Sequence, residues 1–388
     1  MIPDIIFRRV GLLGTGALMG FLAGRFLEAP EGGAPEEKER SMHDASLGFF
    51  SPHLPSGANF PSHDNVFVRH AYTCSINYRT KTPNWVAEHL KFSQPDKKNG
   101  DRKRASFRSD EDIPDAFRAH NRDYWDSGWS RGHLAASASH RTTQDEQDST
   151  FLLNSNIVPQ DMSMNGCDWN RVEVLVRDLV KKFGDVYVLS GPVWIPESRP
   201  GISQRPFTKN KVIVHEVVGD SSVHVPTHLF KAIRVEDPQG IISSCAFILP
   251  NTFIAEEKSL DSYVVSIDEV EKLTGLDFSG MKSNNDLCSS IRCDRKENRR
   301  MRGWRIYGLI DDARSVDELR VAVRKAIDEG YVDSDNFLIP KIIRDRMKDI
   351  ELLPDPVNLF PDEEHYRLAV ERGFENFLKR PIPTDALS

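Results

Sequence analysis

The sequence has no excess of positive charge, because 51 lysines and arginines face 58 aspartates and glutamates, for a net charge of −7. A protein-wide positive field of the kind that attracts polyanions is therefore excluded. Any nucleic-acid-binding function must depend on local clusters of basic residues. At 388 residues, of which 39% are hydrophobic, the chain is long enough for two domains around a real core.

Cysteines are also scarce, with only five in the whole chain. An odd number of widely spaced cysteines is not typical of a disulfide framework, so we expect reduced thiols. Cys288 and Cys293 are of the residue type found in half of a zinc site. No second Cys or His pair follows them at the spacing of a zinc finger, so we do not predict zinc binding.

No apolar run reaches the roughly 20 residues that a membrane-spanning helix needs. The N-terminal candidate, residues 10–24, has fifteen apolar residues between Arg9 and Arg25. A secretory signal, a mitochondrial targeting segment and a cytosol-facing anchor all fit this pattern. Glycines at positions 16, 20 and 24 form a face that favours helix pairing in lipid. We predict that residues 1–27 are a mitochondrial targeting segment and membrane anchor.

The segments at 28–65 and 353–388 carry few signals of folded structure. Residues 28–65 are rich in Pro, Gly, Glu and Ser, and their burial cannot offset the entropy lost on ordering. We predict a disordered linker there. The tail at 353–388 shows only a weak helical pattern at 366–377, and no role is assigned to it.

Strand patterns occur in the middle of the chain, at residues 186–189, 211–218, 228–235 and 242–249. Apolar residues from Trp169 to Phe183 recur at helical spacing, and Gly184 supplies a stop signal. We therefore expect a sheet with this helix packed on it.

Two further helices are predicted from their ends. Ser266 with Glu269 forms a capping box for a helix that ends at Gly275. The same pair of residue types at 315 and 318 begins a helix that ends at Gly330, with an apolar stripe along one side.

Reactive side chains are concentrated between Ser130 and Glu173. Cleavage of a phosphodiester needs a base to deprotonate water, a cation to neutralise the phosphorane charge, and a proton for the leaving oxygen. His133 can supply the base, because an imidazole that titrates near 6.5 is largely neutral at working pH. Arg131 can bind two phosphate oxygens in a fork, a geometry that lysine lacks.

Asparagines follow the histidine at positions where they can act as metal ligands. Asn165 and Asn170 offer neutral carbonyl oxygens, which suit a hard dication that keeps most of its waters. Glu173 follows Asn165 by eight positions, so on a regular helix the two lie about 80° apart, two turns along the same side. Both side chains can then face one ion.

Taken singly, none of these residues is diagnostic. A histidine after glycine is most often an ordinary surface or core histidine, and an Arg-Gly pair is commonly a turn. An asparagine is commonly a helix cap, and a glutamate on an amphipathic helix is usually solvated. The spacing alone does not establish an active site.

Three ordered blocks change this assessment. Ser127–His133, Ser155–Asp161 and Trp169–Glu173 resemble the ββα-metal nucleases of the DNA/RNA non-specific endonuclease family, and the resemblance extends over residues 67–349. Ser130 stands where most of the family carries Asp, and in this the chain is similar to the exo/endonuclease G-like branch.

The resemblance implies an α+β fold with two parts. Residues 66–287 would form a ββα-metal nuclease core around a central antiparallel sheet, and residues 288–352 a C-terminal helical wing. The sequence departs from the family just after the histidine, where Ala136, Ser139 and His140 replace the usual Pro and pair of Asn.

Carried over residue by residue, the resemblance implies that His133 is the general base and that Arg131 contacts the phosphate. Asn165 would bind the metal directly and Glu173 through water, and Ser130 completes the catalytic set. The implied cofactor is Mg²⁺, with Mn²⁺ as a substitute. The implied activity is 5′–3′ exonuclease and endonuclease cleavage of DNA and RNA, in mitochondrial DNA maintenance and repair. The implied form is a homodimer anchored to the inner mitochondrial membrane.

Two segments are locally basic and suited to follow phosphates. Residues 91–108 contain seven basic and two acidic residues, and residues 295–305 contain six and one. Arg102 and Arg141 fall where the family places basic DNA contacts. We expect both to bind nucleic acid, although a solvated arginine is the alternative.

The second segment adds Arg299 and Arg305 to the predicted nucleic-acid contacts. Trp304 and Tyr307 beside them are of the type that stacks on a splayed base. The protein core is nevertheless the commoner place for an aromatic side chain.

Two alternative functions stay open. An endonuclease G-type enzyme would act mainly on internal bonds, and Ser130 and the predicted wing argue against it. A catalytically silent family member would bind DNA without cutting, and the intact set of His133, Asn165 and Glu173 argues against that.

Overall fold

The computed structural model describes residues 51–92, 99–198, 209–331, 338–349 and Arg367. The predicted anchor at 1–27 and, apart from Arg367, the predicted tail at 353–388 lie outside these residues. In the described part, no helix is both long and apolar enough to cross a membrane.

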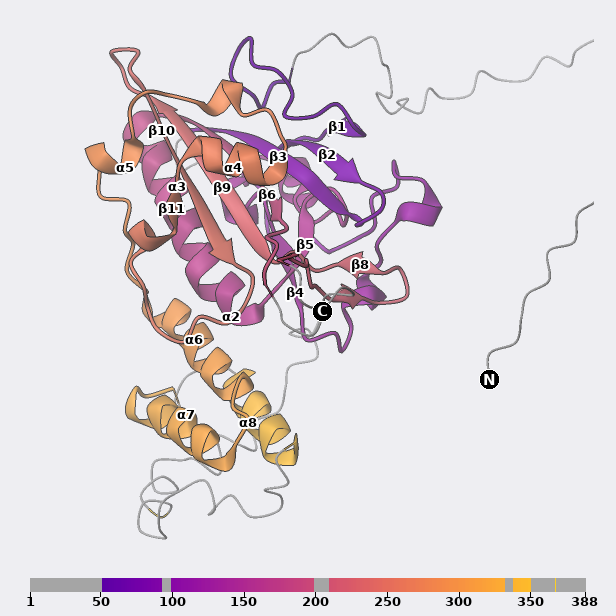
Figure 1. The fold of residues 1–388 in the computed structure, drawn as a ribbon, viewed down its shortest axis with the longest axis vertical. Coiled ribbons are helices and arrows are strands. Elements are labelled where there is room, and N and C mark those ends of the chain that lie inside the picture. Colours follow the sequence, from indigo (N-terminus) through magenta and orange to yellow (C-terminus); the bar gives the residue numbers. More distant parts are fainter. Residues whose placement is uncertain (1–50, 93–98, 199–208, 332–337, 350–366, 368–388) are drawn as a thin grey trace, which may run out of the picture. The chain divides into compact units, whose positions relative to one another are not determined.

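A seven-stranded antiparallel sheet forms the centre of the protein (Figure 1). Its strand order is β1-β2-β3-β6-β9-β10-β11, so each hydrogen-bonded neighbour is also the next strand of this sheet along the chain. The fold class predicted from the sequence is confirmed. The strands are β1 (Val66–Val68), β2 (Thr73–Asn77), β3 (Thr82–Lys91), β6 (Asp185–Val193), β9 (His228–Glu236), β10 (Ile242–Pro250) and β11 (Val264–Val265).

Both faces of this sheet are covered, because side chains alternate along each strand. On β3, Trp85 and Ala87 enter one hydrophobic cluster, whereas Val86 and Leu90 enter another. Glu88 shares the second face with Val86, and it is only 2% exposed. A buried carboxylate at this place already indicates a polar network beneath one layer.

The layer on the face of Val86 holds the ββα element. Strands β4 (Ser130–His133) and β5 (Ile157–Gln160) pair antiparallel, and α3 (Asn170–Phe183) follows them. The predicted helix is confirmed, including its end at Gly184, where φ is +86°. Its buried stripe packs against the sheet through residues such as Val172, Leu175 and Leu179. Short helices α1 (Gln144–Ser149) and α2 (Met162–Met164) connect these elements.

The opposite face is covered by α4 (Ile267–Thr274) and by the first described residues. The Ser266 side chain caps α4 and Gly275 ends it in the left-handed region, as predicted. Leu54 is 7% exposed in the same cluster, and the hydroxyl oxygens of Ser51 and Thr73 lie 2.8 Å apart. The linker predicted at 28–65 therefore extends too far, because residues from Ser51 onward pack on the core.

One predicted strand is largely wrong. Of residues 211–218, only Val217–Val218 form a strand, β7, which pairs with β8 (Val223–His224). Val212 adds a single isolated bridge to Glu197. Ile213 is 47% exposed and Val214 is 37% exposed, so the apolar residues that indicated a strand do not lie in the core.

Figure 1 shows α6 leading from the core to α7 and α8, and these C-terminal helices are called the wing below. Helix α7 begins at the predicted Ser315 cap, and its stripe joins a separate hydrophobic cluster with α6 and α8. The helices are α5 (Leu287–Ser290), α6 (Arg299–Asp311), α7 (Val316–Asp328) and α8 (Leu338–Asp349).

Arg305 joins the wing to the core. Its side chain is 0% exposed, and Nη2 donates to the two carboxylate oxygens of Asp168 at 2.9 and 3.1 Å. It also pairs with Glu297. Arg171, likewise buried, donates to Asp168 from the other side at 2.9 Å. The predicted contact of Arg305 with nucleic acid is therefore wrong, because this guanidinium is held inside the protein.

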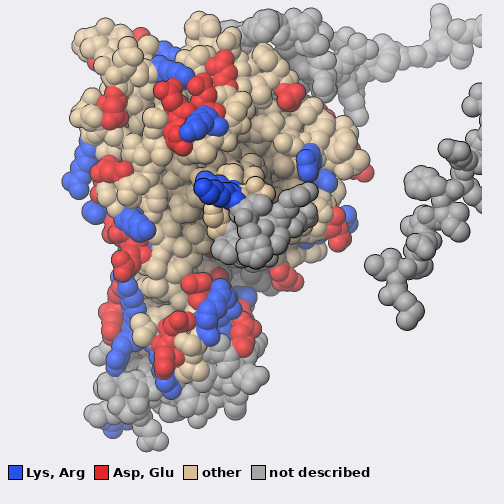
Figure 2. Space-filling view, viewed as in Figure 1, with Lys and Arg blue, Asp and Glu red and all other residues tan. Residues whose placement is uncertain are grey.

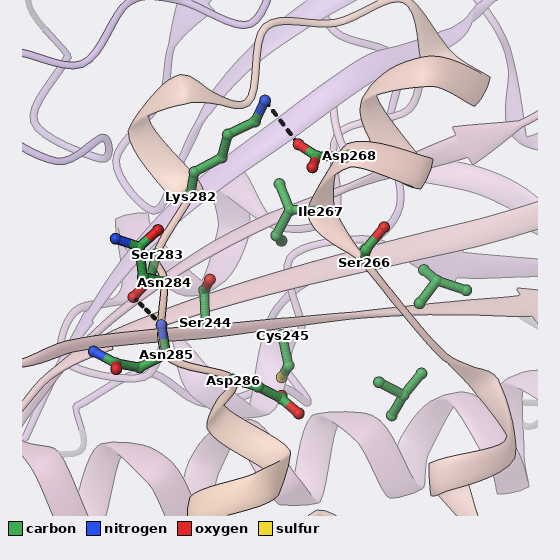
Figure 3. Close-up of a pocket in the computed structure, with 12 residues that line it drawn as sticks. Ser244, Cys245, Ser266, Ile267, Asp268, Lys282, Ser283, Asn284, Asn285 and Asp286 are labelled. Atoms are coloured by element: carbon green, nitrogen blue, oxygen red, sulfur yellow. Dashed lines mark hydrogen bonds and ion pairs between the residues drawn. The ribbon is translucent and has the colours of Figure 1, made fainter.

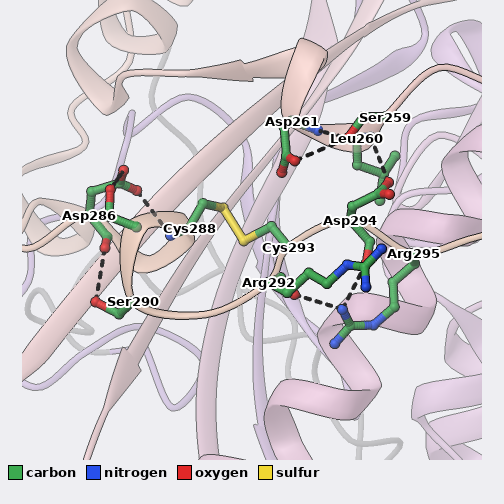
Figure 4. Close-up of a disulfide and its surroundings, with 11 residues drawn as sticks. Ser259, Leu260, Asp261, Asp286, Cys288, Ser290, Arg292, Cys293, Asp294 and Arg295 are labelled. Carbon is green, nitrogen blue, oxygen red and sulfur yellow. Dashed lines mark hydrogen bonds between the residues drawn. A yellow bond between two sulfur atoms is a disulfide. The ribbon is translucent and has the colours of Figure 1, made fainter.

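Cysteines 288 and 293 form a disulfide, which corrects the expectation of reduced thiols (Figure 4). Their Cα atoms lie 5.3 Å apart, within the range that a disulfide spans. The bond closes the short turn after α5, where Cys293 is 1% exposed. The sequence could not show that this turn folds back on itself. The other three cysteines are buried as free thiols.

The buried position of Arg305 leads to a stability prediction. Arg305→Met should lower the free energy of unfolding by about 3 kcal/mol, the lower end for removing one partner of a buried pair, since Asp168 keeps Arg171. Urea denaturation measures the change. Arg320→Met is the control, because Arg320 pairs with Asp317 on the surface of α7 at 2.9 Å and should cost less than about 1 kcal/mol. Equal losses would contradict the assignment.

Candidate active site

His133 is placed by the β4–β5 ribbon. It ends β4, opposite Ile157, and its carbonyl oxygen accepts a 3.0 Å hydrogen bond from the Trp169 indole. Gly132 precedes it, and a Cβ there would lie 2.0 Å from the Gln160 side chain. A larger residue at position 132 would displace the buried Gln160 side chain, so the glycine has a structural reason as well.

The His133 imidazole lies in an apolar, positively charged pocket. It is 9% exposed, with ring centroids 5.4 Å from Phe107 and 4.9 Å from Phe151. Burial, reinforced by the charges of Arg102 and Arg131, lowers its pKa to about 3. Nε2 is buried and has no hydrogen-bond partner among the described residues. A neutral ring nitrogen without a partner is what a general base requires before its water or substrate arrives.

Basic side chains surround a cavity of about 1040 Å³ beside His133. Arg131 lies over the Phe107 ring at 4.4 Å, and its Nη1 donates to Asn121 at 3.0 Å. Arg102 lies 5.6 Å from the Phe151 ring and donates to Ser137. The aromatic rings that contact His133 therefore also form the cavity wall. Its basic lining residues are Arg102, Lys103, Arg131, Arg141 and Arg300.

Arg300 belongs to α6, so the wing contributes to this cavity. The charge of Arg300, after burial, helps to lower the pKa of Arg102. This repulsion shows that the cavity concentrates positive charge without an equal number of anions. The sequence analysis did not select Arg300 as a site residue, although it lies in the second basic segment.

Asn165 is tied to the strand that carries His133. Its amide nitrogen donates to the Ser130 hydroxyl at 3.0 Å, and that hydroxyl donates to the Gln160 carbonyl at 2.8 Å. Ser130 thus orients Asn165 and leaves the amide oxygen as a candidate ligand. Residues Asn165–Trp169 form a π-helical turn. The expectation of 80° on a regular helix therefore does not apply, and π turns are frequent at functional sites.

Glu173 lies on α3 with its side chain 14% exposed. Burial raises its pKa, against the opposing charges of Lys231 and Arg177. Arg177 is the neighbouring cation, at 3.8 Å. A carboxylate that is poorly solvated gains from an additional cation nearby.

A buried polar network lies beneath Glu173, and sequence reasoning missed it. Lys231, 1% exposed, donates to the Leu134 carbonyl at 2.8 Å and lies 3.8 Å from Glu88. Glu88 also lies 2.8 Å from the His140 imidazole. The sequence analysis predicted no strand at β3, and no sequence signal showed that Glu88 and Lys231 pair.

The oxygen donors of Asn165 and Glu173 fit a hard dication in their chemistry. Glu173 belongs to no cluster of three His, Cys or acidic side chains among the described residues. Such a site would hold its ion through few protein atoms and several waters. The protein ligands are sparse, and the orphaned His133 Nε2 is the more specific feature.

The second basic segment is mostly neutralised. Arg302 pairs with Glu329 at 2.6 Å and Arg295 with Asp178 at 3.0 Å. Arg299 is exposed but donates to the Gly330 carbonyl at 3.0 Å, so it stays only a candidate contact. Figure 2 shows basic and acidic side chains interspersed over the face that it presents.

The aromatics of that segment lie in the wing. Tyr307 is 8% exposed, and a Cβ at Gly166 would meet the Trp304 indole at 2.3 Å. Both belong to the cluster of α6, α7 and α8 or pack against it. Both side chains therefore pack within the protein, as is commoner for aromatic residues, rather than stacking on a base.

Another cavity, of about 680 Å³, lies between β10 and the turn at 282–286 (Figure 3). It is lined by Lys282, which pairs with Asp268 at 2.9 Å, and by Cys245 and Asp286. None of the predicted site residues lines it. Arg102, Arg131 and Arg141 line the first cavity, which is therefore the candidate active site. His133, Asn165 and Glu173 are not among its lining residues, and His133 adjoins it through the rings of Phe107 and Phe151.

Comparisons with known proteins show the family of this chain. The sequence profile of the DNA/RNA non-specific endonuclease family matches residues 51–284. The mitochondrial nuclease EXOG of Danio rerio is 32% identical over 289 residues, covering 73% of this chain and 81% of that protein. Human mitochondrial endonuclease G is 36% identical over 210 residues, covering 54% and 68%. A solved EndoG/EndoGI complex matches 58% of this chain and 89% of its own at 33% identity, with a TM-score of 0.53.

The lowered pKa of His133 predicts how stability depends on pH. The unfolded chain takes up a proton near pH 6.5, whereas the folded imidazole stays neutral down to about pH 3. The stability that comes from holding His133 neutral is fully present above pH 6.5, and it is lost as the pH falls from 6.5 towards 3. The slope is at most about 1.4 kcal/mol per pH unit for one proton.

Urea denaturation between pH 4 and 7 tests this. His133→Gln should flatten the decline relative to the parent, while His53, whose pKa burial also lowers to about 4, contributes equally to both proteins. Parallel curves for parent and variant would show that His133 is not held neutral by the fold.

Proposed function

Because the chain belongs to the DNA/RNA non-specific endonuclease family of metal-dependent hydrolytic nucleases, we propose that it is a magnesium-dependent mitochondrial nuclease that hydrolyses DNA and RNA. The proposal is supported above all by one observation. His133, at the end of the ββα ribbon, presents a buried and unpaired Nε2 beside a cavity lined with arginines.

The environment of His133 supports its role as general base. Its lowered pKa keeps the imidazole neutral across neutral pH. In the tautomer with its proton on Nδ1, Nε2 can then accept a proton from water. Arg102 and Arg131, the same residues that lower this pKa, are placed to bind the phosphate. A bound phosphate would partly neutralise them and so make His133 a stronger base when substrate is present.

We propose that Asn165 and Glu173 hold the metal, Asn165 directly and Glu173 through water. Magnesium fits these oxygen donors, Mn²⁺ is a substitute, and the ion would neutralise charge on the phosphate. The Ser130 hydroxyl orients Asn165 through its 3.0 Å hydrogen bond. Ser130 is thus a positioning residue in this proposal.

Phosphate recognition is assigned to Arg102, Arg131 and Arg141, with Arg300 added from the wing. Contacts to phosphate carry no base or sugar information, which is consistent with cleavage of both DNA and RNA. Arg299 is the weaker candidate, because it already binds a backbone carbonyl.

We further propose both 5′–3′ exonuclease and endonuclease activity, in maintenance and repair of mitochondrial DNA. Arg300 supports an end-directed component, since through it the wing reaches the cavity. The relatives named mitochondrial nucleases, together with the apolar run at 10–24, support attachment to the inner mitochondrial membrane. A homodimer rests on the family resemblance. The nearer alternative is an endonuclease G-type activity on internal bonds.

The function is tested with the purified protein and Mg²⁺ on end-labelled linear DNA, closed circular DNA and RNA. His133→Ala should lower the rate by at least about 100-fold, the lower end for a general base, with DNA affinity nearly unchanged. His63→Ala is the matched control, because His63 is exposed and packs beside Phe60 on the other sheet face.

Each substrate separates two hypotheses. Cutting of any substrate excludes a silent binding protein. Cutting of circular DNA without stepwise release of nucleotides from the labelled end of linear DNA would leave only the endonuclease G-type alternative. Loss of rate and affinity together in His133→Ala would argue against a base.

The metal assignment is tested by magnesium titration of activity. Asn165→Ala should need a much higher Mg²⁺ concentration for half-maximal rate, since few protein atoms hold the ion. Ser130→Ala should show a smaller shift, because it removes only the hydrogen bond that orients the amide. Overlaying titrations of Asn165→Ala and the parent would exclude Asn165 as a ligand.

A further inference from the structure

Trp125 is the most exposed tryptophan of the described residues, with 69% of its surface accessible. Trp85 and Trp169, by contrast, are fully buried. A single exposed aromatic is ordinary on a protein surface. Trp125, however, lines the basic cavity beside His133, opposite side chains suited to phosphate. Its position rather than its exposure requires an explanation.

Trp125 is attached to a turn that is held by hydrogen bonds. It follows a 3₁₀ turn, Asn121–Tyr124, in which Tyr124 is 7% exposed. The Asp123 carboxylate is 1% exposed and accepts hydrogen bonds from the backbone N–H groups of His120, at 2.7 Å, and Ser221, at 3.1 Å. Because these hydrogen bonds already hold the turn, binding a ligand at Trp125 requires little further loss of backbone conformational entropy.

The same turn orients a phosphate contact. Asn121 accepts the 3.0 Å hydrogen bond from Arg131 Nη1, and its own amide donates to the Phe107 carbonyl at 2.6 Å. Trp125 and the partner of Arg131 therefore lie four residues apart in one short element. Asp101 is the one acidic residue among the described residues that line the cavity. A fitting ligand joins an anionic group to a flat apolar one.

We infer that Trp125 forms a stacking subsite for an unpaired base at the wall of this cavity. Within a duplex both faces of a base are covered by its neighbours, so only an unstacked base can lie on the indole. Stacking is tolerant of sequence because every base has a π face. The inference rests on the proposed function, whose phosphate contacts bring the strand to this wall.

The test measures equilibrium binding of the full-length protein to labelled nucleic acid at one fixed salt concentration, with EDTA to prevent cleavage. Trp125→Ala should raise the Kd for a single-stranded oligonucleotide by roughly 5- to 150-fold, the range of one base–aromatic stack. Trp125→Phe keeps a ring and should lose less. The Kd for a blunt duplex of the same sequence should not change.

Two controls isolate stacking. Phe92→Ala removes another exposed aromatic, 55% accessible and outside the cavity lining, and should leave every Kd unchanged. A strand of abasic residues keeps the phosphates without bases, so parent and Trp125→Ala should bind it equally.

Three results would overturn the subsite. The first is an equal Kd of parent and Trp125→Ala for the single strand, which is expected if this face binds a protein or a membrane. The others are an equal rise in the Kd for single strand and duplex, and a rise that persists on the abasic strand. If the parent protein still cuts DNA with Mg²⁺, these results reject the Trp125 subsite and leave the proposed nuclease function intact. A parent that neither binds nor cuts would overturn the proposed function as well.

Discussion

The carboxylate of Asp168, held between two buried arginines, is the interaction on which the rest of the site depends. Arg171 comes from α3 and Arg305 from α6, and both guanidinium groups are 0% exposed. Removing either arginine would leave the buried carboxylate of Asp168 only partly neutralised. The free-energy cost of that loss exceeds the stability that a buried ion pair adds relative to apolar residues of similar size. The cluster thus fixes the wing, the core and the π turn in one arrangement.

That arrangement determines the spacing of the candidate metal ligands. Asp168 lies inside the π turn that begins at Asn165 and precedes the helix of Glu173. The extra residue of a π turn has to be held in place, and two ion pairs hold it. At its other end Asn165 is bound to Ser130 on the strand of His133. The base and the ligands are therefore coupled through short, specific contacts rather than through loops.

The sequence predicts those elements whose signal is local. Helix α3 and the capped helices α4 and α7 follow from apolar periodicity and from the residues at their ends. The π turn does not follow, because nothing in residues 165–169 distinguishes it from a regular helix. The burial of Arg305 is also invisible, since a count of charges does not show which partners the fold brings together. The same limit concealed Lys231, whose partner Glu88 lies far away in the chain. It also concealed Arg300, which lines a cavity with residues from distant segments.

An acidic protein can still handle a polyanion if its positive charges are the ones left unpaired. Arg295, Arg302 and Arg305 look like a binding surface in the sequence, yet carboxylates neutralise each of them. Arg102, Arg131 and Arg300 have no carboxylate ion-pair partner within 4 Å among the described residues, and they lower the pKa of His133 or of one another. These unpaired charges lie together in one partly desolvated cavity, where salt screens them only weakly. Attraction is thereby confined to the place where the base lies, and net charge ceases to be a guide to function.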